Sequence, residues 1–456
     1  MAMSYRVRFW DIRERPNRRR PFEVRWTVSG REKSESFTTK GLAESRRAKL
    51  MTAAREGEPF DESSGLPVSE LRALKQRTTW YAHARDYIDQ KWDRTPGNSR
   101  RTLADALATV TPALTDSASA GPDPRVLRRA LYSWAFNKNA WTQEPPGEWR
   151  TALEWAERHS LPVMALDDPI VLRRGLDALT LKLDGGQAAA KTVLRKKATF
   201  SDALGFAVDK GYLRSNPIPG ARWRGPESTE EVDPECVPNP TQVANLLDAV
   251  QQQRGRGPHL APFFGCMYFA AMRPAEVIRL QLANCQLPEK GWGLLTLRRG
   301  IVLAGREWTN DGRAHEEHTL KKRAAKEARP VPIPPEFVAE LRAHIERYGT
   351  AEDGRLFRSE RSLYVQSAAY GKTWKRAREI ALSKEEQASL VAKRPYDLRH
   401  AGISFWLHSG VDPAECARRA GQSIEVMFRV YAKVLAAGQE RANQRIAIAM
   451  REWAGR

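Results

Sequence analysis

A proline-rich stretch from Asn216 to Pro240 limits most strongly what this chain can fold into. It holds six prolines, at positions 217, 219, 226, 234, 238 and 240, and an acidic run over 227–235. Proline lacks a backbone N–H and has a fixed φ, so neither a long helix nor a central strand passes easily through such a stretch. We therefore expect an interdomain linker over 219–238 that separates independently folded parts of the 456-residue chain.

The chain begins with the period-two alternation that is typical of β-strands. Apolar residues alternate with polar ones in two runs, first Tyr5, Val7 and Phe9, and then Phe22, Val24, Trp26 and Val28. We expect a small sheet with a helix over 43–55, together forming a domain over 1–62. A basic outer face suits insertion of strands into a DNA major groove, and a solvated basic face is the alternative. The candidate DNA contacts are Arg6, Arg8 and Arg25.

Residues 66–218 are predicted to form an all-helical domain, interrupted at glycine and proline pairs such as Gly121-Pro122. Its last helix, expected over 187–212, carries a cluster of cations near its start. Lysine and arginine there would contact DNA phosphates without reading the sequence, although each could equally lie on a solvated helix face. The cluster comprises Lys191, Arg195, Lys196 and Lys197.

The charge balance points to a polyanionic partner. The net charge is +20 and the pI is about 10.0, and the sequence has no apolar run long enough to span a bilayer, so nucleic acid is expected and a membrane is not. Four cysteines are scattered without C-x-x-C spacing, which argues against a zinc site or a disulfide scaffold. With no secretory leader pattern at the start, we expect a cytoplasmic protein.

Four short motifs lie in the C-terminal part, over 239–456. Arg273 ends an apolar helix and precedes Pro274, which suits the first position of a new helix. Arg399 lies within Tyr396-Asp397-Leu398-Arg399-His400, and Tyr431 lies nine residues after Gln422. Between them, Leu320-Lys321-Lys322-Arg323 is followed by the alternating segment Arg329-Pro330-Val331-Pro332-Ile333.

These motifs resemble the catalytic domain of tyrosine recombinases, the phage integrase family, and the actinobacterial integrases in particular. The family pattern is an Arg that opens a helix, a Lys in a β-hairpin, His-x-x-Arg-His, Gly-His-Ser, and a Tyr nine residues after that last His. The resemblance extends to 1–62 as an arm-type DNA-binding domain and to 66–218 as a core-binding domain. It implies a multidomain fold with a small β-sheet-plus-helix domain, an all-α domain, and a mixed, mainly helical α+β catalytic domain.

The resemblance also implies roles for individual residues. Arg273 and Arg399 would bind the non-bridging phosphate oxygens, and Tyr431 would attack the phosphorus and hold the cut end as a 3′-phosphotyrosine. Lys321 would protonate the leaving 5′ oxygen; Lys322 stays open, because a slip of one residue reverses the face of a strand. The covalent bond conserves the energy of the phosphodiester, so the reaction needs neither metal nor cofactor.

Two positions depart from the family pattern. Tyr396 stands where the family has His or Lys, and Gln422 where it has His or Trp. Both can still donate a hydrogen bond to a phosphate oxygen, but glutamine cannot carry a proton and tyrosine is a poor base near neutrality. We expect a slower enzyme. His400 could supply the missing imidazole, although the family's His at that place usually has a structural role.

The sequence thus predicts a site-specific DNA recombinase that acts as a homotetramer on double-stranded DNA through a Holliday junction. An arm-type domain favours an integrase of a phage or mobile element over a chromosome-dimer resolvase or a type IB topoisomerase. A directionality factor or DNA-bending host protein is a possible partner. The alternative is a DNA-binding relative that has lost efficient catalysis. Further phosphate contacts are expected from Lys372, Lys375 and Arg376, with a solvated helix face as the alternative. A C-terminal helix over 438–453 is expected to dock on a neighbouring protomer, and packing on its own catalytic domain is the alternative.

Overall fold

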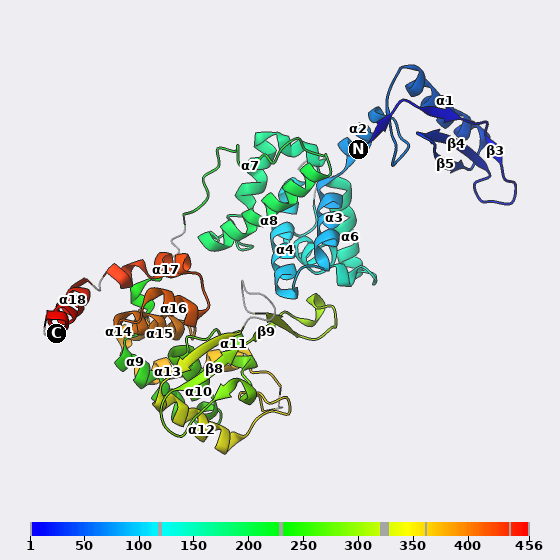
Figure 1. Cartoon of the computed structure of the whole chain (residues 1–456). Coiled ribbons are helices and arrows are strands. Elements are labelled where there is room, and N and C mark those ends of the chain that lie inside the picture. The colour runs from blue at the N-terminus through cyan, green and yellow to red at the C-terminus, as the bar shows by residue number, and fades with distance from the viewer. Residues whose placement is uncertain are drawn as a thin grey trace. The chain divides into compact units, whose positions relative to one another are not determined.

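The computed structural model describes residues 2–116, 121–227, 231–319, 328–360, 363–436 and 439–454 (Figure 1). The chain divides into two compact units. The N-terminal unit comprises Met1–Thr95 and Ser99–Glu227, and the C-terminal unit comprises Pro96–Asn98 and Ser228–Arg456. The fold is mainly helical with small antiparallel sheets in both units, in keeping with the mixed architecture expected from the sequence.

The N-terminal unit begins with the predicted sheet. Its central strand β4 (Phe22–Val28) pairs antiparallel with β2 (Val7–Phe9), β3 (Arg13–Glu14) and β5 (Arg31–Phe37). Helix α1 (Lys40–Arg55) is capped by the Thr39 hydroxyl and covers the sheet. Alternate residues of β4, Val24, Trp26 and Val28, form the small core with Leu50, as the period-two pattern predicted. A second strand pair joins β1 (Met3–Ser4) and β6 (Phe60–Asp61).

The rest of the N-terminal unit is helical. Trp80, which opens α3, is fully buried against Phe200 of α8. The cation-rich helix expected over 187–212 is α8, and it is three residues shorter at each end than predicted. The helices are α2 (Val68–Arg77), α3 (Trp80–Trp92), α4 (Gly97–Val110), α5 (Pro124–Ala130), α6 (Gly147–His159), α7 (Pro169–Ala178) and α8 (Ala190–Asp209).

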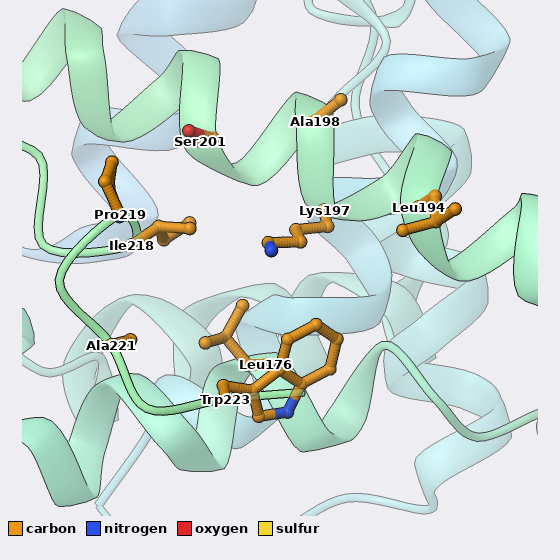
Figure 2. A pocket seen from close by; sticks show the side chains of 9 residues that line it. All are labelled: Leu176, Leu194, Lys197, Ala198, Ser201, Ile218, Pro219, Ala221 and Trp223. Carbon is orange, nitrogen blue, oxygen red and sulfur yellow. The ribbon is translucent and has the colours of Figure 1, made fainter. Parts of the chain in front are cut away.

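The predicted linker is not free along its whole length. Trp223 donates an Nε1–H hydrogen bond to Asp177 of α7 at 2.8 Å, and Pro219 and Trp223 line a pocket with α7 and α8 of about 490 Å³ (Figure 2). At the other end, the Val232 amide donates to the carbonyl of Val430 in the C-terminal unit at 2.9 Å. Both ends of the proline-rich stretch therefore pack on folded parts of the chain.

The C-terminal unit is built around α10 (Gly257–Phe269), which is buried along its length and packs on α9, α12 and α15. Helix α9 begins at the predicted cap, where Asn239 and Gln242 form a capping box. A three-stranded antiparallel sheet has the order β11-β8-β7, and β9 pairs antiparallel with β10. The strands are β7 (Cys285–Gln286), β8 (Gly293–Leu297), β9 (Arg299–Leu303), β10 (His315–Thr319) and β11 (Arg329–Ile333).

The helices that follow the sheet bring the C-terminal motifs onto the central helix. Helix α15 approaches α10 so closely that a Cβ atom on Gly402 would overlap the carbonyl of Tyr268. No helix in the described residues is long and apolar enough to cross a membrane. The remaining helices are α9 (Pro240–Gln251), α11 (Pro274–Arg279), α12 (Pro335–Tyr348), α13 (Ser367–Ala381), α14 (Lys384–Ala388), α15 (Asp397–His408), α16 (Pro413–Ala420), α17 (Ile424–Ala436) and α18 (Gln439–Ala454).

Candidate active site

The Tyr431 side chain lies inside the C-terminal unit. Its helix, α17, is interrupted at this residue, where φ is −113° and ψ is 21°. The side chain is 1% exposed and packs in a cluster with Ile403, Ala417 and Met427. The hydroxyl lies 2.9 Å from Nδ1 of His400 on α15. The kink and the hydrogen bond thus fix the phenol between two helices.

The environment of Tyr431 favours the protonated phenol. Burial raises the pKa of the hydroxyl well above its usual value, and the positive charge of Arg399 only partly opposes this effect. A nucleophilic role for Tyr431 therefore requires an acceptor for its proton when the phosphate arrives.

Arg399 on α15 is also buried, with 1% of its surface exposed. Its Nη2 donates to the carbonyl oxygen of Ala420 at 2.6 Å, and its Nη1 donates to that of Ala271. Ala271 has a φ of 46°, which turns the end of the apolar helix toward Arg399. Burial, and next the charge of Arg273, lower the pKa of Arg399 from its usual value, so an added anion here would relieve electrostatic repulsion.

Arg273 is held at the start of α11 by Glu276. Its amide donates to Oε2 of Glu276 at 2.8 Å, and its Nη1 lies 2.9 Å from Oε1. Its Nη2 donates to the carbonyl of Gly421 at 3.1 Å. The side chain is 24% exposed, so of the two predicted arginines Arg273 is the one that reaches the surface.

A third arginine, which was not among the predicted site residues, completes the cluster. Arg329 on β11 is 1% exposed; its Nη2 lies 2.5 Å from Oε2 of Glu276 and its Nη1 donates to Ala420. Burial lowers its pKa to about 10. Burial acts to raise the pKa of Glu276, but the charges of Arg329 and Arg273 outweigh it and hold that pKa below its usual value.

The sequence did contain a signal for Arg329. In Arg329-Pro330-Val331-Pro332-Ile333 the residues at positions 329, 331 and 333 share one face of the strand, and all three are buried. An arginine on the face that carries Val331 and Ile333 must pair with a carboxylate inside the protein. The partner, Glu276, is also visible as the residue three positions after Arg273.

The turn after α16 is the point where the three arginines meet. Arg273 bonds to the carbonyl of Gly421, and Arg329 and Arg399 bond to that of Ala420. Gly421 has a left-handed conformation, with φ of 63°, and a Cβ atom there would lie 2.5 Å from Nη1 of Arg329. Glycine is thus required both for the backbone conformation and for the close approach.

The two residues that depart from the family pattern flank this cluster. Tyr396 is half-buried, and its ring packs edge-on against His400 with centroids 5.2 Å apart. Gln422 follows Gly421, and its Nε2 lies 3.6 Å from Sδ of Met427. The structure therefore brings Arg273, Arg399, Tyr431 and Tyr396 together with His400. The predicted Lys321 and Lys322 lie outside the described residues.

The predicted DNA contacts on α8 are not all at the surface. Lys191 and Arg195 are exposed. Lys196 is buried, 2.9 Å from Thr109 Oγ1 and 3.3 Å from Asp105 Oδ2, so its predicted phosphate contact is corrected to an internal ion pair. The Lys197 ammonium lies beside the Trp223 ring, 5.1 Å from its centroid, in the pocket of Figure 2. One part of the α8 surface therefore packs against other parts of the unit, and another part faces solvent.

The other predicted contacts lie at the surface. Arg25 is half-buried, 3.5 Å from Glu32 and over the ring of Trp10. Those fully at the surface are Arg6, Arg8, Lys372, Lys375 and Arg376.

Comparisons with known proteins were made for both sequence and structure. No protein-family model matches the sequence, and no curated protein matches it. Among solved structures, the Tn1549 transposon integrase in complex with transposon right end DNA is similar over 62% of this chain and 88% of its own, with 16% identity and a TM-score of 0.48.

Two further solved structures are also similar. The XerH site-specific recombinase bound to difH substrate is similar over 74% of this chain and 92% of its own, with 13% identity and a TM-score of 0.41. The DNA-bound lambda integrase is similar over 55% and 75%, with 13% identity and a TM-score of 0.36. These three solved structures are integrases and a site-specific recombinase, each bound to DNA.

Proposed function

We propose that this protein is a site-specific DNA recombinase that cuts and rejoins strands through a 3′-phosphotyrosine at Tyr431. The observation that carries the proposal is the meeting of three arginines with a buried tyrosine around one turn. Arg273, Arg329 and Arg399 bond to Ala420 and Gly421, and Arg273 and Arg399 act electrostatically on the Tyr431 hydroxyl. Three guanidiniums and one carboxylate, Glu276, leave an excess of positive charge beside a nucleophile.

That excess fits a phosphodiester, which is anionic and gains charge in its pentacoordinate transition state. Preorganised cationic donors stabilise such a state more than the ground state, and a guanidinium matches two phosphate oxygens at once. Arg273, the partly exposed member, would bind a non-bridging oxygen first. Arg399 would exchange a backbone carbonyl for a second oxygen as the phosphate enters.

The remaining roles follow from the sequence motifs. Lys321, or Lys322 if the hairpin is shifted by one residue, would protonate the leaving 5′ oxygen. Tyr396 and Gln422 would donate hydrogen bonds to the phosphate in place of the histidines that the family pattern has. Removal of one preorganised donor costs roughly 10²- to 10³-fold in rate, so replacement of two donors by weaker ones predicts a slow enzyme.

The parts outside the site suit work on paired DNA sites. The N-terminal sheet carries Arg6 and Arg8 at its surface, and α13 carries Lys372 and Lys375. We propose that these cations bind phosphates and that the N-terminal sheet makes the protein an integrase of a phage or mobile element, with a resolvase as the second choice.

Assembly is proposed from the last helix. Helix α18 exposes Ile446, Met450 and Trp453, the last of them 84% exposed. We propose that this stripe docks on a neighbouring protomer of a tetramer on DNA. A chain truncated after residue 436 would then bind a single site with unchanged affinity but fail to form the tetramer in sedimentation of DNA complexes. Tetramers of the truncated chain would contradict this assignment.

A second function, DNA binding without catalysis, is favoured by one observation. Without DNA the Tyr431 hydroxyl is bonded to His400, and Arg399 is occupied by two carbonyls. A protein locked in this state would hold DNA and not cut it. The two functions differ in whether a covalent bond to DNA forms.

The test is a covalent-capture selection from a pool of random-sequence duplexes that carry one nick per strand. The nick lets the short fragment beyond the cut diffuse away, so cleavage cannot reverse. Wild type and Tyr431→Phe are incubated with the pool, and DNA that stays attached in hot detergent is sequenced. The proposal predicts enriched sequences with wild type and none with Tyr431→Phe. Specific DNA retained only under native conditions, by both proteins, would support the binding function instead.

A further inference from the structure

His400 is placed to exchange a proton with the nucleophile. Its Nδ1 lies 2.9 Å from the Tyr431 hydroxyl, and its ring packs between that of Tyr431, at 5.9 Å, and that of Tyr396, at 5.2 Å. The imidazole is half-buried on the first turn of α15, directly after Arg399. The hydrogen bond and the aromatic contacts therefore help to fix both the position and the plane of the ring.

Four other described side chains act electrostatically on the hydroxyl, and none of these four is suited to take its proton. Those whose charges act on Tyr431 are Arg399, Tyr396, Cys236 and Arg273. Guanidiniums have no acceptor atom, and a phenol is neutral near neutrality, with a reference pKa of about 10. Burial raises the pKa of the Cys236 thiol, which keeps it protonated. Of this set together with His400, only the imidazole has a lone pair that accepts a proton near neutral pH.

We infer that His400 is the general base that accepts the Tyr431 proton during cleavage and returns it during ligation. This inference rests on the proposed function, because it assigns one step of that reaction. It goes further in moving the acid–base role to a residue outside the family's usual catalytic positions, and in making Tyr396 a support for the His400 ring.

Over one cycle of cleavage and ligation, each proton returns to the group that gave it up. In cleavage the Tyr431 O–H proton moves to Nδ1 of a neutral His400, and the phenolate oxygen bonds to phosphorus. The bond to the 5′ oxygen breaks with protonation from Lys321 or Lys322. In ligation a 5′ hydroxyl attacks the phosphotyrosine and gives its proton back to the lysine. The departing Tyr431 oxygen takes the proton from the His400 imidazolium.

This assignment fixes the pH dependence of cleavage. His400 must be neutral before attack, so the single-turnover cleavage rate rises with pH through the histidine range and then levels off. A histidine that only positioned Tyr431 by accepting its hydrogen bond would also lose this function on protonation, so the profile by itself does not separate the two roles. The comparison that separates the two roles is His400→Asn, because the asparagine Oδ1 can occupy the place of Nδ1 and accept a hydrogen bond but cannot hold a proton.

The experiment measures single-turnover cleavage of a captured nicked duplex by the full chain, from about pH 5 to about pH 8. The experiment compares wild type with His400→Asn and His400→Ala. The matched control is His408→Asn, at the end of the same helix. We expect both His400 variants to cleave more slowly by about 10²- to 10⁴-fold and to lose the rise with pH. His408→Asn should follow wild type in rate and profile.

A substrate with sulfur in place of the leaving 5′ oxygen separates the two proton transfers. A thiolate leaves without protonation, so this substrate should restore a Lys321→Ala variant and leave the His400 variants slow. Wild-type rates for His400→Asn, or its rescue by sulfur, would overturn the inference while the Tyr431 adduct still upheld the proposed function. Loss of that function would appear separately, as the absence of any adduct with wild type.

Discussion

Nη2 of Arg329 lies 2.5 Å from Oε2 of Glu276, and neither side chain is more than 4% exposed. The same guanidinium also donates a hydrogen bond to the carbonyl of Ala420 and so holds the turn after α16. This buried ion pair therefore connects β11 to α11 and to that turn. The ion pair is itself buried, and it fixes the geometry of Arg273 and Arg399.

Substitution of Arg329 tests the structural role of this ion pair. Arg329→Met leaves the Glu276 carboxylate buried with Arg273 as its remaining ion-pair partner, and we expect a loss of about 3–5 kcal/mol in the free energy of unfolding. The matched control is Arg342→Met, because Arg342 is half-exposed and lies 3.8 Å from Glu289, where the loss should stay below about 1 kcal/mol. Urea unfolding of the full chain measures both. Equal losses would show that Arg329 is not a structural centre.

A pair of glycine substitutions tests the packing of α15 on α10. A methyl group on Gly402 would meet the backbone of Tyr268, so Gly402→Ala should destabilise the protein by at least about 1–3 kcal/mol and move Arg399 away from Ala271. Gly371 on α13 has open space around its Cβ position, and Gly371→Ala should stabilise by about 0.5–1 kcal/mol. Melting temperatures that shift in the same direction would contradict the assigned contact.

The elements with strong local signals were predictable from the sequence. The alternation in β4, the Asn239 cap of α9 and the cation-rich helix α8 all depend on neighbouring residues, and each was found. Lys196 was misplaced because the sequence shows that a helix carries a lysine but not that Asp105, far along the chain, faces it. The contacts of Trp223 and Val232 within the linker were not predicted for the same reason, since their partners are distant in sequence.

The candidate site likewise contains residues that were predictable from the sequence and residues whose roles were not. Spacing selected Arg273, Arg399 and Tyr431, and the structure brings them to one turn. The roles of Arg329 and of His400 depend on where β11 and α15 meet α16 and α17, which is a tertiary property. The buried register of Arg329 beside Val331 and Ile333 was the sequence signal for Arg329, and the place of His400 directly after Arg399 made it a candidate in advance.

The buried histidine pair predicts a loss of stability in acid. His259 packs on His344, with ring centroids 5.0 Å apart, and burial lowers the pKa of His259 to about 3. In the unfolded chain this group takes up a proton below its ordinary pKa of about 6.5, whereas in the folded chain it stays neutral. The stability it contributes is therefore full above about pH 6.5 and falls as the pH drops toward 3.

The contribution should fall by up to about 1.4 kcal/mol per pH unit. The difference between wild type and His259→Leu isolates it, because other acid-sensitive groups are common to both proteins. Urea unfolding from neutral pH to about pH 4 should show a flatter dependence for His259→Leu. Parallel curves for the two proteins would mean that His259 is protonated in the fold.

The exposed and buried lysines should differ in their effect on DNA binding. Lys372→Gln with Lys375→Gln removes two exposed cations of α13, and the slope of log affinity against log salt should fall by about 0.9 for each phosphate that these lysines neutralise. Lys196→Met, which removes the internal partner of Asp105, should leave that slope unchanged and lower stability. Binding titrations over a range of salt measure the slope. An unchanged slope for the double variant would remove α13 from the DNA surface.

The identity of the attached residue tests the central claim most directly. A captured DNA–protein adduct is digested with nuclease and trypsin, and the peptide that carries the nucleotide is sequenced by mass spectrometry. The account predicts a nucleotide joined through its 3′ phosphate to the phenol of Tyr431, with no modification of the neighbouring Tyr396. Attachment to Tyr396, or through a 5′ phosphate, would contradict it.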